Sequence, residues 1–256
     1  MSLSKLGGSR VSRLSFVALL LTLITSQAAR ADNWKDGDLT TFGTLDWISN
    51  STAINLLFNN FSSVYASQGG TLIVGDRANF ILIFSGPVAV SEYLPSSGPP
   101  GPLDSTLVNP VYTSAGIFGT DVVGLELDVD FADAHLLPDN SNAVFGDLVL
   151  EGFSVPGVNG MTVRQFLADC NSELGGGPGP FAINDIEPAI LQPLSTAFSG
   201  RVATAFAEDH LVSQTNPPVP APEPSSLVLL GIALLATGMI RSRLSSRNHV
   251  ARIFQE

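Results

Sequence analysis

Residues 122–131 read VVGLELDVDF and carry the clearest alternating pattern in the middle of the chain. Apolar and acidic residues alternate over the second half, which places carboxylates at Glu126, Asp128 and Asp130. Because successive side chains of a strand point to opposite faces, this pattern predicts a β-strand with one acidic and one apolar face. The stretch therefore favours a fold that contains a β-sheet.

The acidic face of this predicted strand is also the candidate metal site of the chain. Asp133 follows Glu126, Asp128 and Asp130, and carboxylates at this density are the oxygen ligands that calcium prefers. The spacing lacks the glycine and glutamate positions of an EF-hand loop. A solvated strand face is the simpler interpretation, and a calcium site formed by these four residues stays open as the alternative.

Other segments complete an α+β pattern around this stretch. Thr162 and Gln165 have the spacing of a capping box at the start of a helix, and Asn50 or Ser51 is placed to cap an earlier helix. Short apolar runs bounded by turn residues predict strands. Strands are predicted at 71–74 and 79–84, as a hairpin, and at 108–112, 114–118 and 145–153; further helices are predicted at 88–94, 185–198 and 201–212.

A proline-rich loop stands between these elements. Residues 95–102 read PSSGPPGP, and the prolines fix an irregular surface loop. A stiff connector is the simpler interpretation, and a loop that contacts a glycan is the alternative.

We expect one exported α+β domain over residues 32–212, with a mainly antiparallel sheet flanked by several helices. Its length of about 190 residues is enough for a single core. The only cysteine of the chain, Cys170, cannot form an intrachain bridge, so the fold does not depend on a disulfide. Burial in a helix is the expected place for Cys170.

The exported part is strongly acidic. Residues 32–223 hold 22 acidic and 4 basic residues, a net charge of −18. Such a surface repels nucleic acid and anionic lipid headgroups, which excludes nucleic acid as a partner. The charge is compatible with divalent cations or neutral glycans.

The sequence offers no pattern typical of catalysis, and we expect the protein not to be an enzyme. It contains no Gly-x-Ser-x-Gly elbow, and its cysteine and histidines supply no closed set of zinc ligands. Two carboxylates are enough for a glycosidase, so a secreted carbohydrate-active hydrolase stays open as an alternative. No cofactor is expected apart from the calcium considered above.

The N-terminus predicts a secretory signal peptide over residues 1–31. Basic residues precede the apolar run at 14–24, and small residues stand at Ala29 and Ala31, the two positions that a signal peptidase reads. Cleavage is expected after Ala31.

The C-terminal region combines four features in a fixed order. A proline-rich linker at 213–221 precedes a tripeptide formed by Pro222, Glu223 and Pro224. An uncharged run follows at 225–240, and then a basic cluster formed by Arg241, Arg243 and Arg247. A helix over the sixteen uncharged residues reaches about 24 Å, against roughly 30 Å for a hydrocarbon core, a mismatch that bilayer thinning can close. The arginines place residues 248–256 in the cytoplasm and the upstream domain outside.

This arrangement resembles the PEP-CTERM sorting signal of Gram-negative bacteria. The resemblance covers about the last 35 residues, with 222–224 as the sorting motif, the transmembrane helix within 222–247, and the arginines as the cluster that stops transfer. It implies recognition by exosortase, a membrane-embedded cysteine transpeptidase-like protease, and delivery to the cell surface or extracellular polysaccharide. The tail at 248–256 departs from the family, whose signals usually stop soon after the arginines.

Together these features predict an exported protein that is membrane-anchored before processing and then belongs to the cell surface or extracellular matrix. Its predicted role is that of a structural or binding protein of the exopolysaccharide layer. The expected partners are exosortase, the membrane through the C-terminal helix, and extracellular polysaccharide. A calcium- or glycan-binding module and a secreted hydrolase are the alternatives.

Overall fold

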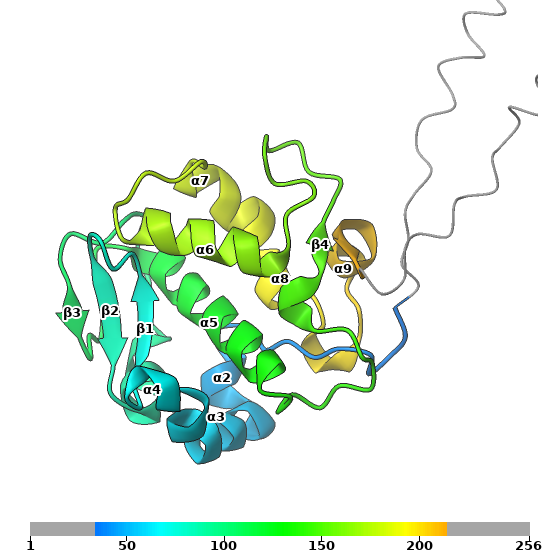
Figure 1. The fold of residues 1–256 in the computed structure, drawn as a ribbon, viewed down its shortest axis with the longest axis horizontal. Coiled ribbons are helices and arrows are strands. Elements are labelled where there is room, and N and C mark those ends of the chain that lie inside the picture. The colour runs from blue at the N-terminus through cyan, green and yellow to red at the C-terminus, as the bar shows by residue number, and fades with distance from the viewer. Residues whose placement is uncertain (1–33, 214–256) are drawn as a thin grey trace, which may run out of the picture. The chain divides into compact units, whose positions relative to one another are not determined.

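Helix α5 (Gly116–Asp133) runs through the middle of the domain, with other helices and a small sheet around it (Figure 1). The structure is a computed structural model that describes residues 34–213. The predicted signal peptide, with Ala29 and Ala31, and the sorting signal at 222–247 lie outside these residues. Within 34–213, no helix has the length and apolar character needed to cross a membrane.

The predicted strand at 122–131 is wrong, because these residues belong to α5. The predicted strand at 114–118 is wrong too, since it overlaps the first turn of the same helix. Fourteen of the 18 residues of α5 are buried, and a helix that is apolar around its circumference packs on all sides. The alternation is local, whereas the apolar stretch as a whole exceeds the roughly 4–8 residues of a typical strand.

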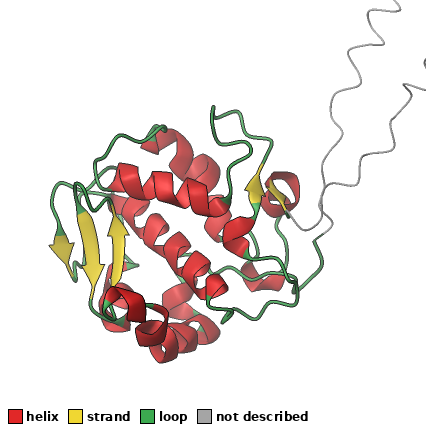
Figure 2. Ribbon diagram, viewed as in Figure 1, coloured by secondary structure: helices red, strands yellow, loops and turns green. Residues whose placement is uncertain are grey.

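Within residues 34–213, five short strands form two separate sheets (Figure 2). The predicted hairpin is confirmed: β1 (Leu72–Gly75) and β2 (Ile81–Phe84) are antiparallel, and β3 (Leu107–Val108) pairs with β2 in parallel. A second pair is formed by β4 (Val149–Leu150) and β5 (Leu211–Val212). The α+β class holds, but only Val108 of the strand predicted at 108–112 and only 149–150 of the strand predicted at 145–153 are in strands. A helix, and not the expected sheet, occupies the centre.

The helices of the N-terminal half form beside the hairpin. Asn50 caps α3 (Ser51–Val64) as predicted, because its side chain accepts from backbone N–H groups of the first turn. The shorter α2 (Asp46–Ser49) precedes it and η1 (Ala66–Gln68) follows it. The helix predicted at 88–94 is confirmed as α4 (Pro87–Tyr93).

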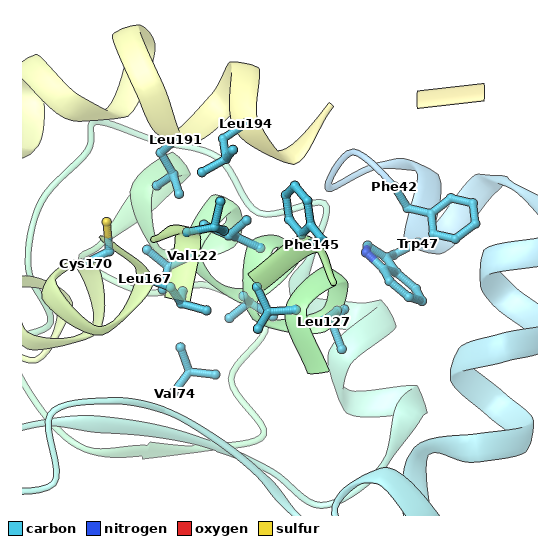
Figure 3. Packing of buried hydrophobic residues seen from close by; sticks show 14 of the residues in the cluster. Phe42, Trp47, Val74, Val122, Leu127, Phe145, Leu167, Cys170, Leu191 and Leu194 are labelled. Atoms are coloured by element: carbon cyan, nitrogen blue, oxygen red, sulfur yellow. The ribbon is translucent and has the colours of Figure 1, made fainter. Parts of the chain in front are cut away.

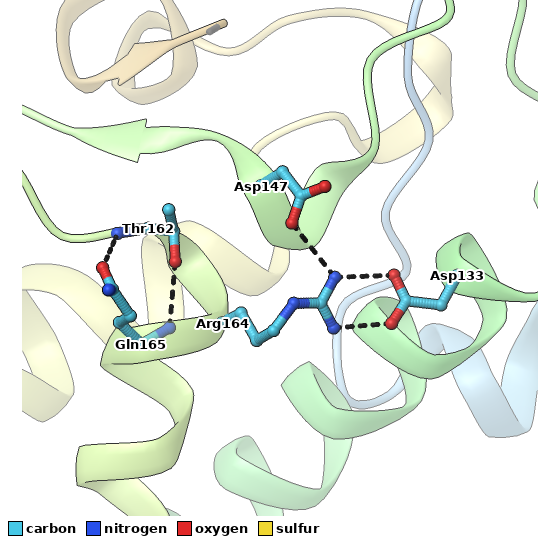
Figure 4. A network of polar contacts seen from close by, with 5 residues as sticks. All are labelled: Asp133, Asp147, Thr162, Arg164 and Gln165. Carbon is cyan, nitrogen blue, oxygen red and sulfur yellow. Dashed lines mark hydrogen bonds and ion pairs between the residues drawn. The ribbon is translucent and has the colours of Figure 1, made fainter.

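The predicted capping box is present at the start of α6 (Val163–Leu174) (Figure 4). Gln165 N–H donates to Thr162 Oγ1 over 3.2 Å, and Thr162 N–H donates to Gln165 Oε1 over 2.8 Å. Most of the helix predicted at 185–198 forms, with a π-helical turn in it, whereas only 205–210 of the segment 201–212 is helical. The remaining segments are η2 (Phe145–Asp147), α7 (Ile183–Ile186), the π-helical η3 (Glu187–Leu191), α8 (Gln192–Ser195), η4 (Ser199–Arg201) and α9 (Ala205–His210).

The core is built from side chains that converge on α5 from both halves of the chain (Figure 3). Trp47 packs between Phe42 and Phe131, with ring centroids 5.1 Å apart in each pair. Cys170 is fully buried on α6, as predicted, and Leu191 is fully buried on η3. The core therefore ties segments that are distant in sequence to one central helix.

Replacement of Thr162 by Ala tests the capping box. The substitution removes the acceptor of an N–H group at the start of α6, and we expect it to lower the free energy of unfolding by about 1 kcal/mol. Urea unfolding followed by circular dichroism measures the change. Thr52→Ala, an exposed threonine in the first turn of α3, is the control. Equal stability of the two variants would show that the box contributes nothing.

Candidate functional site

Helix α5 divides its carboxylates between two sides. Glu126, Asp130 and Asp133 are spaced four and three residues apart and share one side of the helix. Asp121 and Asp128 are seven residues apart and both contact the segment at 42–44. The predicted arrangement of Glu126, Asp128 and Asp130 on one face is therefore wrong. No group of three or more histidine, cysteine, aspartate or glutamate side chains within 34–213 is arranged to hold a metal ion.

The first side forms a polar contact between α5 and α6. Asn171 donates its amide N–H to Glu126 Oε2 over 2.8 Å. Arg164 binds both oxygens of Asp133, at 2.5 and 2.8 Å, and reaches Asp147 at 3.2 Å (Figure 4). The carboxylates of Glu126, Asp133 and Asp147 are thus already bound by side chains of the protein.

Burial raises the pKa of two carboxyl groups on this side of α5. Burial and the neighbouring charge of Asp130 raise the pKa of Glu126 to about 8. Burial, joined by the charge of Asp133, raises the pKa of Asp130 to about 6. Glu126 is therefore mainly neutral at pH 7, which makes it a poor ligand for calcium, whereas Asp130 is mainly ionised. Glu126 and Asp133 act as structural contacts between helices.

The second side of α5 borders a cleft. Asp128 is wholly buried, accepts the Phe42 N–H over 2.8 Å, and has a pKa raised well above its ordinary value by burial. Asp121 lies two turns earlier and lines a cleft of about 410 Å³. The other lining residues come from 43–46, from the 94–97 loop and from α8.

Asp121 is the more deeply buried of the two acidic residues that line this cleft, the other being Asp46. Only 5% of the residue is exposed, Oδ1 accepts from Thr44 Oγ1 over 2.7 Å, and Oδ2 has no hydrogen-bond partner among the described residues. Burial raises the pKa of Asp121 to about 6. The hydrogen bond from Thr44 opposes this rise, and the charge of Glu187 adds to it. The carboxyl group is mainly ionised at pH 7 and retains acceptor capacity.

Neutral polar groups complete the lining. Gln192, Ser195, Thr196 and Ser96 supply amide and hydroxyl groups, and the exposed Leu45 adds an apolar surface. Ser96 Oγ is covered and has no partner within 34–213. Carboxylates at Asp121 and Asp46 among hydroxyl and amide groups suit a neutral ligand with many hydroxyl groups better than an anion.

Within 34–213, the two histidines and the cysteine show no catalytic arrangement. His210 contacts the Glu151 carbonyl oxygen through Nδ1 at 2.8 Å and stacks on Phe153, a structural role. His135 is exposed just beyond α5 with a φ of 54°. Burial raises the pKa of the Cys170 thiol well above its ordinary value, which suppresses the nucleophilic thiolate.

Sequence reasoning missed the cleft, including Asp121. Its lining comes from four segments spread between residues 43 and 196, and no local pattern joins them. The proline-rich loop at 95–102 was the one part of the lining that the sequence analysis considered for glycan contact.

The pH dependence of stability tests the proton on Glu126. Its pKa lies at about 8 in the folded state against 4.5 for an ordinary glutamate, so the folded protein binds more protons than the unfolded chain between these values. The free energy of unfolding must then fall as pH rises through this window. We expect Glu126→Gln to flatten the fall in urea titrations. An unchanged slope would refute the assignment, and Glu92→Gln, an exposed residue of α4, is the control.

Comparison with known proteins identifies the C-terminal region. The PEP-CTERM protein-sorting motif matches residues 220–243, which include Pro222, Glu223, Pro224, Arg241 and Arg243. No curated protein and no solved structure matches the chain. The match confirms the resemblance drawn from the sequence and implies export and sorting by exosortase. The chain therefore carries a PEP-CTERM sorting signal, which marks it as an exosortase substrate.

Proposed function

We propose that this protein is a carbohydrate-binding component of the extracellular polysaccharide layer, delivered there by exosortase. The sorting motif at 220–243 supports the proposal, because it implies export and exosortase-mediated sorting to the cell surface. The cleft beside Asp121 is the binding site of the proposal.

The charge of the exported part restricts the ligand. A net charge of −18 over residues 32–223 repels polyanions, so a neutral or cationic polysaccharide fits the domain better than an acidic one. The same repulsion disfavours nucleic acid and anionic lipid as ligands.

The chemistry of the cleft supports a sugar ligand. Asp121 Oδ2 and Ser96 Oγ lack protein partners among the described residues, and sugar hydroxyl groups can both donate and accept. Leu45, which is 61% exposed, supplies an apolar surface of the kind on which C–H groups of a sugar ring pack. A volume of about 410 Å³ lies within the usual range of small-ligand sites, about 300–1,000 Å³. The proposal includes neither calcium nor catalysis.

The processing step is tested by intact-mass analysis of the protein from its native host, with and without exosortase. We expect cleavage after Ala31 in both strains. Loss of the residues that follow the Pro222-Glu223-Pro224 region should require exosortase. A protein that keeps Arg241, Arg243 and Arg247 in both strains would be a permanently anchored domain, and the sorting proposal would be wrong.

Carbohydrate binding is tested with exopolysaccharide purified from the native host. We expect Asp121→Asn to weaken binding by about tenfold, since a hydrogen bond to a charged group is lost while the shape of the side chain is kept. Glu92→Gln removes a similar charge from the exposed face of α4 and is expected to bind like the wild type. Equal affinities of the wild type and Asp121→Asn in affinity electrophoresis would remove the cleft from the proposal.

A further inference from the structure

A second pocket, of about 510 Å³, lies beyond the C-terminal end of α6. Its lining comes from the glycine-rich turn at 176–179, from the start of α7 and from the loop at 100–102. It shares no lining residue with the cleft beside Asp121. The two pockets are therefore separate sites.

Glu173 places a carboxylate at this pocket. The residue is 6% exposed, Oε1 accepts the Phe181 N–H over 2.5 Å, and Oε2 has no hydrogen-bond partner within 34–213. Glu173 also stands in the last turn of α6, where the helix dipole disfavours a negative charge. A buried carboxylate oxygen without a hydrogen-bond partner is compensated by a proton or by a cation, and burial raises the pKa of Glu173.

No cation of the described protein supplies that compensation. The basic residues of 34–213 are Lys35, Arg77, Arg164 and Arg201, and none of them lines the pocket. Arg164 is already paired with Asp133 and Asp147. Asp169, one turn before Glu173, adds a further negative charge. The local potential therefore attracts a cationic ligand.

The remaining lining favours a ligand with a ring. Phe181 offers an aromatic face, Pro100, Pro102 and Pro178 offer rigid apolar surfaces, and Asn184 adds an amide. An ammonium group is attracted both by a carboxylate and by an aromatic face. The volume of about 510 Å³ exceeds what one extended lysine side chain fills.

We infer that this pocket binds a primary ammonium group carried by an amino sugar, with Glu173 as its counter-ion. The choice of a sugar as carrier rests on the proposed function, because a polysaccharide layer supplies such units. Gly179 lies so close that a Cβ there would overlap Cγ of Glu173, which places the 176–179 turn directly against this side chain.

Calorimetric titration of the full domain with glucosamine tests the inference at about pH 6, where an amine of this kind carries its proton. We expect glucosamine to bind at least tenfold more tightly than N-acetylglucosamine, which has the same ring without the charge. Glu173→Gln should lose at least tenfold in glucosamine affinity while its amide oxygen can still accept the Phe181 N–H. Asp169→Asn removes the same charge one turn away and should stay within twofold of the wild type.

Three results would overturn the inference: no binding of glucosamine, equal binding of the N-acetylated sugar, or an unchanged affinity of Glu173→Gln with an unchanged melting temperature. An Nα-acetyl-lysine methylamide that binds as tightly as glucosamine would overturn the choice of a sugar. The remaining outcome is that exopolysaccharide binding depends on Asp121 but not on Glu173, and that glucosamine does not bind. This outcome would reject this inference alone and leave the proposed function in place.

Discussion

Burial of α5 on nearly all its sides is the constraint on which the rest of the domain depends. The hairpin, α6, η3 and α8 all pack against this one helix. Glycines make the close approach possible: a Cβ at Gly124 would lie 2.9 Å from Thr44 Oγ1, and a Cβ at Gly119 would overlap the Tyr93 hydroxyl group. Larger side chains at these positions would push the 42–44 segment and α4 away from the core.

The same burial decides the chemistry of the acidic residues on α5. A carboxylate brought into the interior needs a hydrogen-bond donor or a proton. Asp128 accepts a backbone N–H from Phe42, Glu126 accepts from Asn171 and holds a proton, and Asp133 at the helix end pairs with Arg164. Asp121 and Asp128 each retain one oxygen without a hydrogen-bond partner among the described residues, but only Asp121 lines the cleft. Its place in that lining separates the candidate binding residue from the structural ones.

Features that are encoded within a few residues could be predicted from the sequence. The capping box of Thr162 and Gln165, the Asn50 cap and the hairpin at 71–84 each depend on local hydrogen bonds or turn residues, and all are present. The sorting signal is likewise contiguous, and the motif match at 220–243 confirms it. The identity of α5 was not predictable in this way, because the seven alternating residues at 125–131 favoured a strand while burial from both halves of the chain favoured a helix. The cleft and the Glu173 pocket could not be predicted for the same reason, since distant segments meet to form them.

The pairing of β4 with β5 has a consequence for the order of events during export. Leu211 and Val212, which close the domain against Val149 and Leu150, are followed by only nine residues before the Pro-Glu-Pro region begins. Trp34 Nε1 also donates to the Leu211 carbonyl oxygen over 3.3 Å, so the first and last parts of the domain meet at the same place. A chain translocated from its N-terminus cannot complete these contacts until residue 212 has emerged. Final closure of the domain and presentation of its sorting signal therefore fall within the same short interval of translocation.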